Sequence, residues 1–179
     1  MGLTTQLNNG TLKLINLEIF LRRTLMKKYI KFALVFLVLG LVFGVFYREF
    51  SKAYGIVNTY ATLGLVHVHF LVLGVVFTLI IGLIINKLEN CHEKLFKSAF
   101  LLYAIGVLGV GLMLAVRGIL DILVRSDKIQ FAVSAGANGA IAGISGLFHA
   151  ILGIGIVLIF VSWLFNKTRI PNDSENKKN

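Results

Sequence analysis

The chain has 179 residues, of which 57% are hydrophobic, and it carries a formal net charge of +10 and a mean hydropathy of +0.85. A soluble domain of this size does not contain so many long, uninterrupted apolar runs. A soluble hydrolase or kinase is also excluded, because the sequence has no phosphate-binding glycine loop before a lysine, no nucleophile elbow and no paired catalytic carboxylates.

Four apolar runs, at residues 30–47, 57–86, 97–124 and 131–165, are long enough to cross a bilayer as helices, which takes roughly 20 residues. Hydrocarbon cannot satisfy exposed backbone groups, and the runs are too uniformly apolar for alternating barrel strands. The sequence therefore predicts an all-α fold, an integral membrane four-helix bundle.

The predicted domain organisation has three parts. Residues 1–25 form an N-terminal extension with little structural role, residues 26–166 the four-helix transmembrane domain, and residues 167–179 a polar cytoplasmic tail. The sequence from Met26, MKKYIKFALVFLVLGLVFG, has lysines before an apolar run, so Met26 resembles the ordinary N-terminus of a protein. It lacks a convincing small-residue cleavage site, so we expect the first span to be retained.

The positive charge is distributed unevenly along the chain. Thirteen basic residues lie in the N-terminal segment, the connection after the second span and the tail, whereas four lie in the other two connections. The positive-inside rule therefore predicts that both termini are cytoplasmic. We interpret the excess charge as a topology signal whose partners are anionic lipid headgroups and not nucleic acid. The thirteen residues are Lys13, Arg22, Arg23, Lys27, Lys28, Lys31, Lys87, Lys94, Lys97, Lys167, Arg169, Lys177 and Lys178.

Five ionisable side chains lie inside the predicted spans: His67, His69, Arg117, Asp121 and His149. Ionisable side chains at membrane depth are costly, at ~2.5–3.5 kcal/mol for arginine or aspartate by insertion scales, so each is a candidate for function. His67 and His69 are two residues apart, which separates them by about 200° around a helix. They cannot hold one metal ion from the same face, and we expect each to face a different space.

The fourth span places small residues around His149. Ala142, Ser145, Gly146 and Gly153 are at helical spacing from it. Close helix packing explains the glycines but does not explain the histidine. A flat porphyrin stacked beside its axial ligand would explain both.

Arg117 and Asp121 are four residues apart on the third span, so an ion pair between them is the simplest expectation. Alternatively, Arg117 binds an anionic group near the outer surface, such as a heme propionate.

The stretch HVHFLVLGVVFTLIIGLI resembles the heme-ligating helix of subunit I of heme–copper oxygen reductases, the C-type oxidases especially. His67, His69 and Gly74 match the HxH of that family and the glycine five residues after its second histidine. The resemblance covers about twenty residues and implies ligation of a high-spin heme by His67 and of a low-spin heme by His69. His149 is similar to the other low-spin ligand, although it lies on the fourth span. The sequence has no histidine cluster for the copper ion, so oxygen reduction is not implied.

From Met26 onward the chain also resembles an uncharacterised family of small bacterial four-helix membrane proteins. The oxidase subunit has twelve helices in three arcs of four. A four-helix chain that resembles one arc is therefore expected to form a homotrimer in the cytoplasmic membrane, consistent with the preference for closed symmetric oligomers.

Four interpretations remain open at this point. The first is a b-type heme protein for electron transfer or gas and redox sensing, with His69 and His149 as axial ligands, His67 as a second ligand or pocket residue, and Arg117 as a propionate partner. Its heme would be non-covalent, because the sequence has no CxxCH. The others are a transporter or channel with the histidines along a polar path, direct copper or zinc binding by the three histidines, and a structural subunit with hydrogen-bonded histidines.

Overall fold

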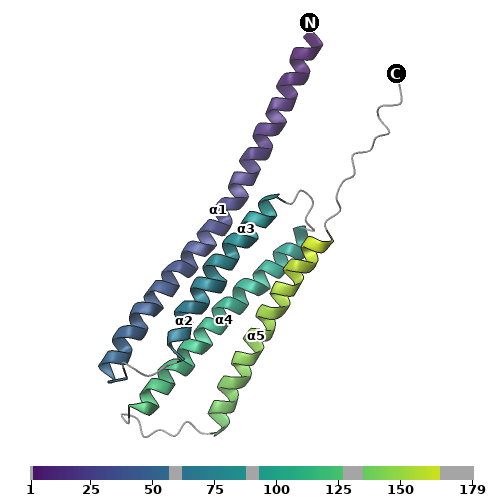
Figure 1. Ribbon diagram of the computed structural model, residues 1–179. Coiled ribbons are helices and arrows are strands. Elements are labelled where there is room, and N and C mark those ends of the chain that lie inside the picture. The colour runs from purple at the N-terminus through teal and green to yellow at the C-terminus, as the bar shows by residue number, and fades with distance from the viewer. Residues whose placement is uncertain (1, 57–61, 88–92, 127–134, 166–179) are drawn as a thin grey trace.

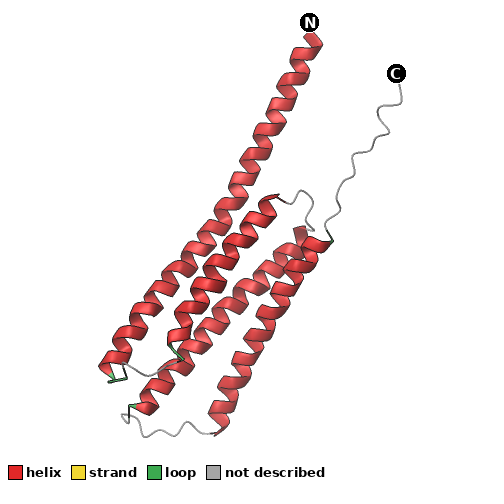
Figure 2. Cartoon of the chain, in the orientation of Figure 1, coloured by secondary structure: helices red, strands yellow, loops and turns green. Residues whose placement is uncertain are grey.

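The computed structural model describes residues 2–56, 62–87, 93–126 and 135–165, and every regular element in these ranges is helical (Figure 2). Three consecutive elements, α2 (Gly64–His69), η1 (Phe70–Phe77) and α3 (Thr78–Lys87), follow one another without a break and form one rod. The other helices are α1 (Gly2–Ala53), α4 (Glu93–Arg125) and α5 (Ala135–Leu164).

Four helical stretches are long and apolar enough to cross a membrane: Met26–Ala53, Gly64–Asn86, Lys94–Arg125 and Gly136–Leu164. The prediction of an all-α chain with four such helices is therefore confirmed. The second helix begins at Gly64 and not at residue 57; residues 57–61 and 131–134 of the predicted spans lie outside the described residues.

A glycine in the left-handed conformation and two backbone hydrogen bonds end the first helix. Gly55 has a φ of +73°, a left-handed conformation that glycine adopts without a steric penalty. Its N–H donates to the Lys52 carbonyl at 3.1 Å, and the Ile56 N–H donates to the Ser51 carbonyl at 2.9 Å. These bonds satisfy carbonyls at the end of α1 and turn the chain back toward the second span.

The N-terminal extension is part of the same helix. Residues 2–25 continue α1 beyond the ends of the other helices, where Leu12, Leu17 and Phe20 are exposed (Figure 1).

The four spans are arranged as an open row (Figure 1). The rod of α2, η1 and α3 packs against α1 on one side and α4 on another, and α5 packs along α4. Within the described ranges, α1 and α5 share no extended contact and lie at opposite ends of the row. One side of α5 is therefore not covered by another described helix.

Glycines let the backbones approach α4 closely. A Cβ on Gly106 would lie 2.5 Å from the Cα of Leu152, and a Cβ on Gly155 would lie 2.5 Å from the backbone nitrogen of Tyr103, so α4 and α5 touch along their backbones. On the other side of α4, a Cβ on Gly118 would meet the backbone of Leu63. These contacts fix the depth of α2 and of α5 relative to α4.

Gly106→Ala is expected to destabilise the protein, because the added methyl group meets helix backbone, and overpacking of this kind costs about 1–3 kcal/mol. Gly136→Ala is the matched control, since no atom lies within 4 Å of the Cβ position there. Thermal unfolding in detergent should give a lower midpoint for Gly106→Ala than for Gly136→Ala. Equal midpoints would show that α4 and α5 do not approach as closely as described.

Candidate functional site

His69 is the last residue of α2, immediately before η1. Its Nδ1 lies 2.9 Å from the carbonyl oxygen of Leu65. A carbonyl oxygen only accepts, so Nδ1–H is the donor, and in the neutral imidazole the lone pair is then on Nε2. The side chain is partly buried, and no described residue bonds its Nε2.

His149 has the same arrangement on α5. Its Nδ1 lies 2.8 Å from the carbonyl oxygen of Ser145, one helical turn earlier, and the side chain is exposed. Metal-ligating histidines usually donate their other ring N–H to a carbonyl or carboxylate, which fixes the tautomer and the ring orientation. Both histidines therefore present Nε2 in the form that binds a metal ion.

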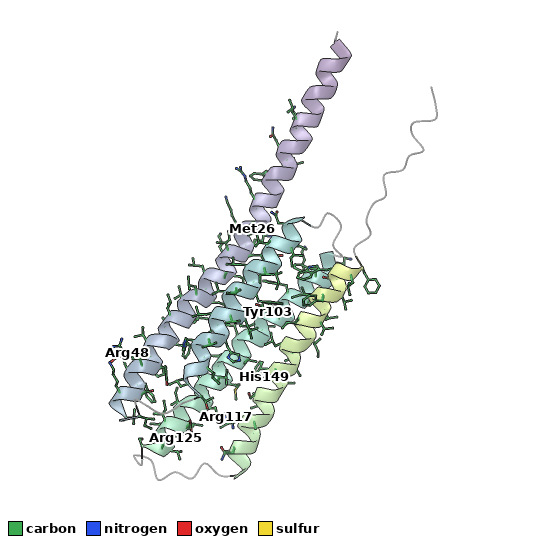
Figure 3. All side chains as sticks on the ribbon, viewed as in Figure 1. Met26, Arg48, Tyr103, Arg117, Arg125 and His149 are labelled. Atoms are coloured by element: carbon green, nitrogen blue, oxygen red, sulfur yellow. The ribbon has the colours of Figure 1, made fainter. Side chains whose placement is uncertain are left out.

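The residues next to the two histidines in sequence both contact α4. Phe70, the residue after His69, occupies the space beside Gly111 of α4, and Phe148, the residue before His149, occupies the space beside Gly109. Each histidine is thus about 100° around its helix from a side chain that contacts α4. His149 and the α4 residue Arg117 lie on the same visible face of the row (Figure 3).

The backbone contacts with α4 also give the relative depth of the histidines. Leu63 is level with Gly118, and Leu152 is level with Gly106. Because α2 and α5 both run antiparallel to α4, each step forward along them corresponds to one step back along α4. His69 is six residues after Leu63 and is therefore level with residue 112 of α4. His149 is three residues before Leu152 and is therefore level with residue 109. At 1.5 Å per residue the two levels differ by about 5 Å.

His67 lies on a different face of α2. The position of a Cβ on Gly44 of α1 is 3.7 Å from the Cβ of His67, so the imidazole packs at the contact between α1 and α2. Its Nδ1 is buried and has no hydrogen-bond partner among the described residues. The opposed directions of His67 and His69 agree with the sequence prediction, but the face of His67 is occupied by α1.

The expected ion pair between Arg117 and Asp121 is wrong. Asp121 accepts a hydrogen bond from the Nε of Arg125 at 2.8 Å, and these two residues are also four apart. The Arg117 side chain is exposed, and no acidic side chain in the described part of the chain pairs with it. Along α4, Arg117 lies about 10 Å closer to the C-terminal end of the helix than the levels of the two histidines.

The small residues beside His149 face open space. At Gly139, Gly143, Gly146 and Gly153 no atom of the described residues lies within 4 Å of an added Cβ. Gly139 and Gly143, which have the GxxxG spacing of close helix packing, therefore do not pack against another described helix of this chain. The space is available to a flat ligand or to a helix of another molecule.

A polyhistidine metal site has no support in the geometry. The described residues contain no group of three or more histidine, cysteine, aspartate or glutamate side chains that could hold a metal ion. His67 is separated from His69 by the helix itself, and only His69 and His149 present comparable imidazoles.

The sequence reasoning missed one buried polar cluster. The hydroxyl of Tyr103 on α4 donates to the carbonyl oxygen of Leu73 and lies 3.1 Å from Oγ1 of Thr78. Leu73 belongs to η1, which is a π-helix, and such segments occur often at functional sites. A tyrosine and a threonine inside apolar spans are the only signals of this cluster in the sequence.

Comparisons with known proteins place the chain in a family without assigning an activity. Residues 26–166 match the family described as Protein of unknown function (DUF2871). No curated protein and no solved structure matches, so the resemblance to the heme–copper oxidases depends on the residues of the second span alone. The match covers most of the chain and all four membrane-spanning helices, and the chain therefore belongs to the DUF2871 family.

Proposed function

We propose that the protein is a b-type heme-binding membrane protein in which His69 and His149 supply the axial ligands. The observation that carries the proposal is the matched state of the two imidazoles. Each donates its Nδ1–H to a carbonyl one turn earlier, and each leaves Nε2 for a metal ion. They flank α4 at depths that differ by about 5 Å.

The surroundings of the two histidines fit a flat, anionic ligand. The glycines around His149 leave room for a macrocycle against α5. Arg117 is a cation without an acidic partner among the described residues, on the outward side of the histidines, and it would bind a propionate. His67 packs against Gly44 and is not assigned as a ligand.

A histidine-ligated heme supports electron transfer when both axial positions are filled, and gas binding when one remains open. With two ligands of the same form, this chain is better suited to electron transfer. The protein's own contribution is to hold the two imidazoles in one tautomer, to exclude water with its apolar helices and to neutralise a propionate with Arg117. The HxH resemblance supports the assignment of His69. Oxygen reduction is not proposed, because the sequence has no copper-binding cluster.

The proposal is tested by absorption spectra of the purified protein, oxidised and reduced, with heme content measured as the pyridine hemochrome. The wild type should show a Soret band and sharp reduced α and β bands. His69→Ala and His149→Ala should each lose the low-spin bands, because each removes one axial ligand. The matched controls are His67→Ala and a substitution in the sequence between the second and third spans, His92→Ala; both should keep the bands.

A colourless wild-type protein, after expression with ample heme supply, would refute the proposal. A red protein whose low-spin bands survive His149→Ala would refute the assignment of His149 and keep the heme. Loss of the bands in His67→Ala but not in His69→Ala would show that the ligand from α2 is His67 and not His69.

We further propose that the chain is a multi-pass protein of a bacterial cytoplasmic membrane with both termini inside, as the basic residues indicate. Cys91 is the only cysteine, and it lies in a connection expected to be cytoplasmic. A membrane-impermeant maleimide should label it only after the cells are permeabilised. Lys52→Cys in a Cys91→Ser background should be labelled in intact cells. The reverse pattern would invert the topology.

We propose that the chain forms a homotrimer: the open side of α5 supports association with other subunits, and the number three comes from the resemblance to one of the three arcs of the oxidase subunit. An exposed His149 and a glycine face cannot both remain against lipid without cost, and small residues allow close packing of helices from different subunits. Native mass spectrometry of the detergent-solubilised protein should give three subunits. Gly143→Leu should reduce the number of subunits, whereas Val72→Leu, at an exposed position of η1, should not. A monomeric wild type would contradict this assembly.

A further inference from the structure

The rod that carries His69 changes its hydrogen-bond pattern immediately after that residue. Residues Phe70–Phe77 form the π-helix η1, whose wider turn takes backbone groups out of the usual i→i+4 register. Leu73, in the middle of this segment, is four residues after His69 and lies on nearly the same side of the rod.

Tyr103 supplies a partner for this segment from α4. Its hydroxyl donates to the Leu73 carbonyl, and the Thr78 hydroxyl, 3.1 Å away, donates to the tyrosine oxygen. Tyr103 and Thr78 are both fully buried. In hydrocarbon each unpaired polar group costs several kcal/mol, so this set of bonds is retained or lost as a unit.

The backbone of Tyr103 also marks the contact with the helix that carries His149. The Cβ position of Gly155, six residues after His149, lies 2.5 Å from the backbone nitrogen of Tyr103. In the described ranges α2 and η1 share no extended contact with α5. The spatial relation between the two histidines therefore passes through α4, and Tyr103 contacts both neighbouring elements: its hydroxyl bonds η1, and its backbone lies against α5.

We propose that Tyr103 is a positioning residue for the heme ligands. Its hydroxyl holds η1 in the π-helical form, and this sets the direction in which His69 presents Nε2 relative to His149. The inference depends on the proposed heme function. It adds a residue that acts on the heme only through the position of His69 and does not bind the heme itself.

The test is Tyr103→Phe, which keeps the ring packing against Phe77 and removes only the hydroxyl. Heme content by pyridine hemochrome should remain near that of the wild type. The ferric electron paramagnetic resonance spectrum should show a shifted low-spin signal with a new high-spin component, and the midpoint potential should move from the wild-type value. Thr78→Val should give the same changes to a smaller degree, and Thr78→Ser, which retains a hydroxyl, should restore the wild-type signal. Tyr47→Phe, on α1, is the matched control and should change nothing.

The inference is overturned if Tyr103→Phe and Thr78→Val lower the thermal unfolding midpoint but leave the low-spin signal and the midpoint potential unchanged, because the hydroxyl would then have only a structural role. If Tyr103→Phe does not fold, Thr78→Val alone decides between the two results. A wild type that binds no heme overturns the proposed function and this inference together, whereas a normal wild-type spectrum with unaltered variants overturns the inference only.

Discussion

The close backbone contacts along α4 are the constraint on which the arrangement of the other helices depends. Gly118 receives the start of α2, and Gly106 with Gly155 brings α5 against the middle of α4. Without a hydrophobic driving force between helices in lipid, such small-residue contacts and the dispersion forces they permit are the main source of association. Each histidine helix is therefore fixed to α4 and not to the other.

In this arrangement the two imidazoles within the apolar helices have the same hydrogen-bond pattern and the same neighbouring helix, α4. A histidine that bonds only its own helix has an unused Nε2, and an exposed imidazole at membrane depth is costly unless something covers it. His149 is exposed and His69 is partly buried on the open row, and the glycines next to His149, Gly146 and Gly153, contact no described residue of another helix. The proposed heme, bound by both imidazoles beside α4, would satisfy both nitrogens, and the proposed assembly would cover the open side of α5.

The four spans and the candidate ligands could be predicted from the sequence, because apolar length and intramembrane histidines are local signals. The partner of Asp121 was predicted wrongly, since Arg117 and Arg125 are both four residues away and spacing does not choose between them. The site of Tyr103 was missed because its partners, Leu73 and Thr78, are on another helix. The π-helix was missed because nothing in a uniformly apolar run distinguishes it from α-helix.

The central claim is that His69 and His149 bind one iron ion together. Near-infrared magnetic circular dichroism of the ferric protein tests it most directly, because the energy of the charge-transfer band depends on the pair of axial ligands. The account predicts the band of a low-spin heme with two imidazoles, in the wild type and in His67→Ala alike. A high-spin spectrum with a single histidine ligand, or a spectrum with no heme band at all, would contradict it.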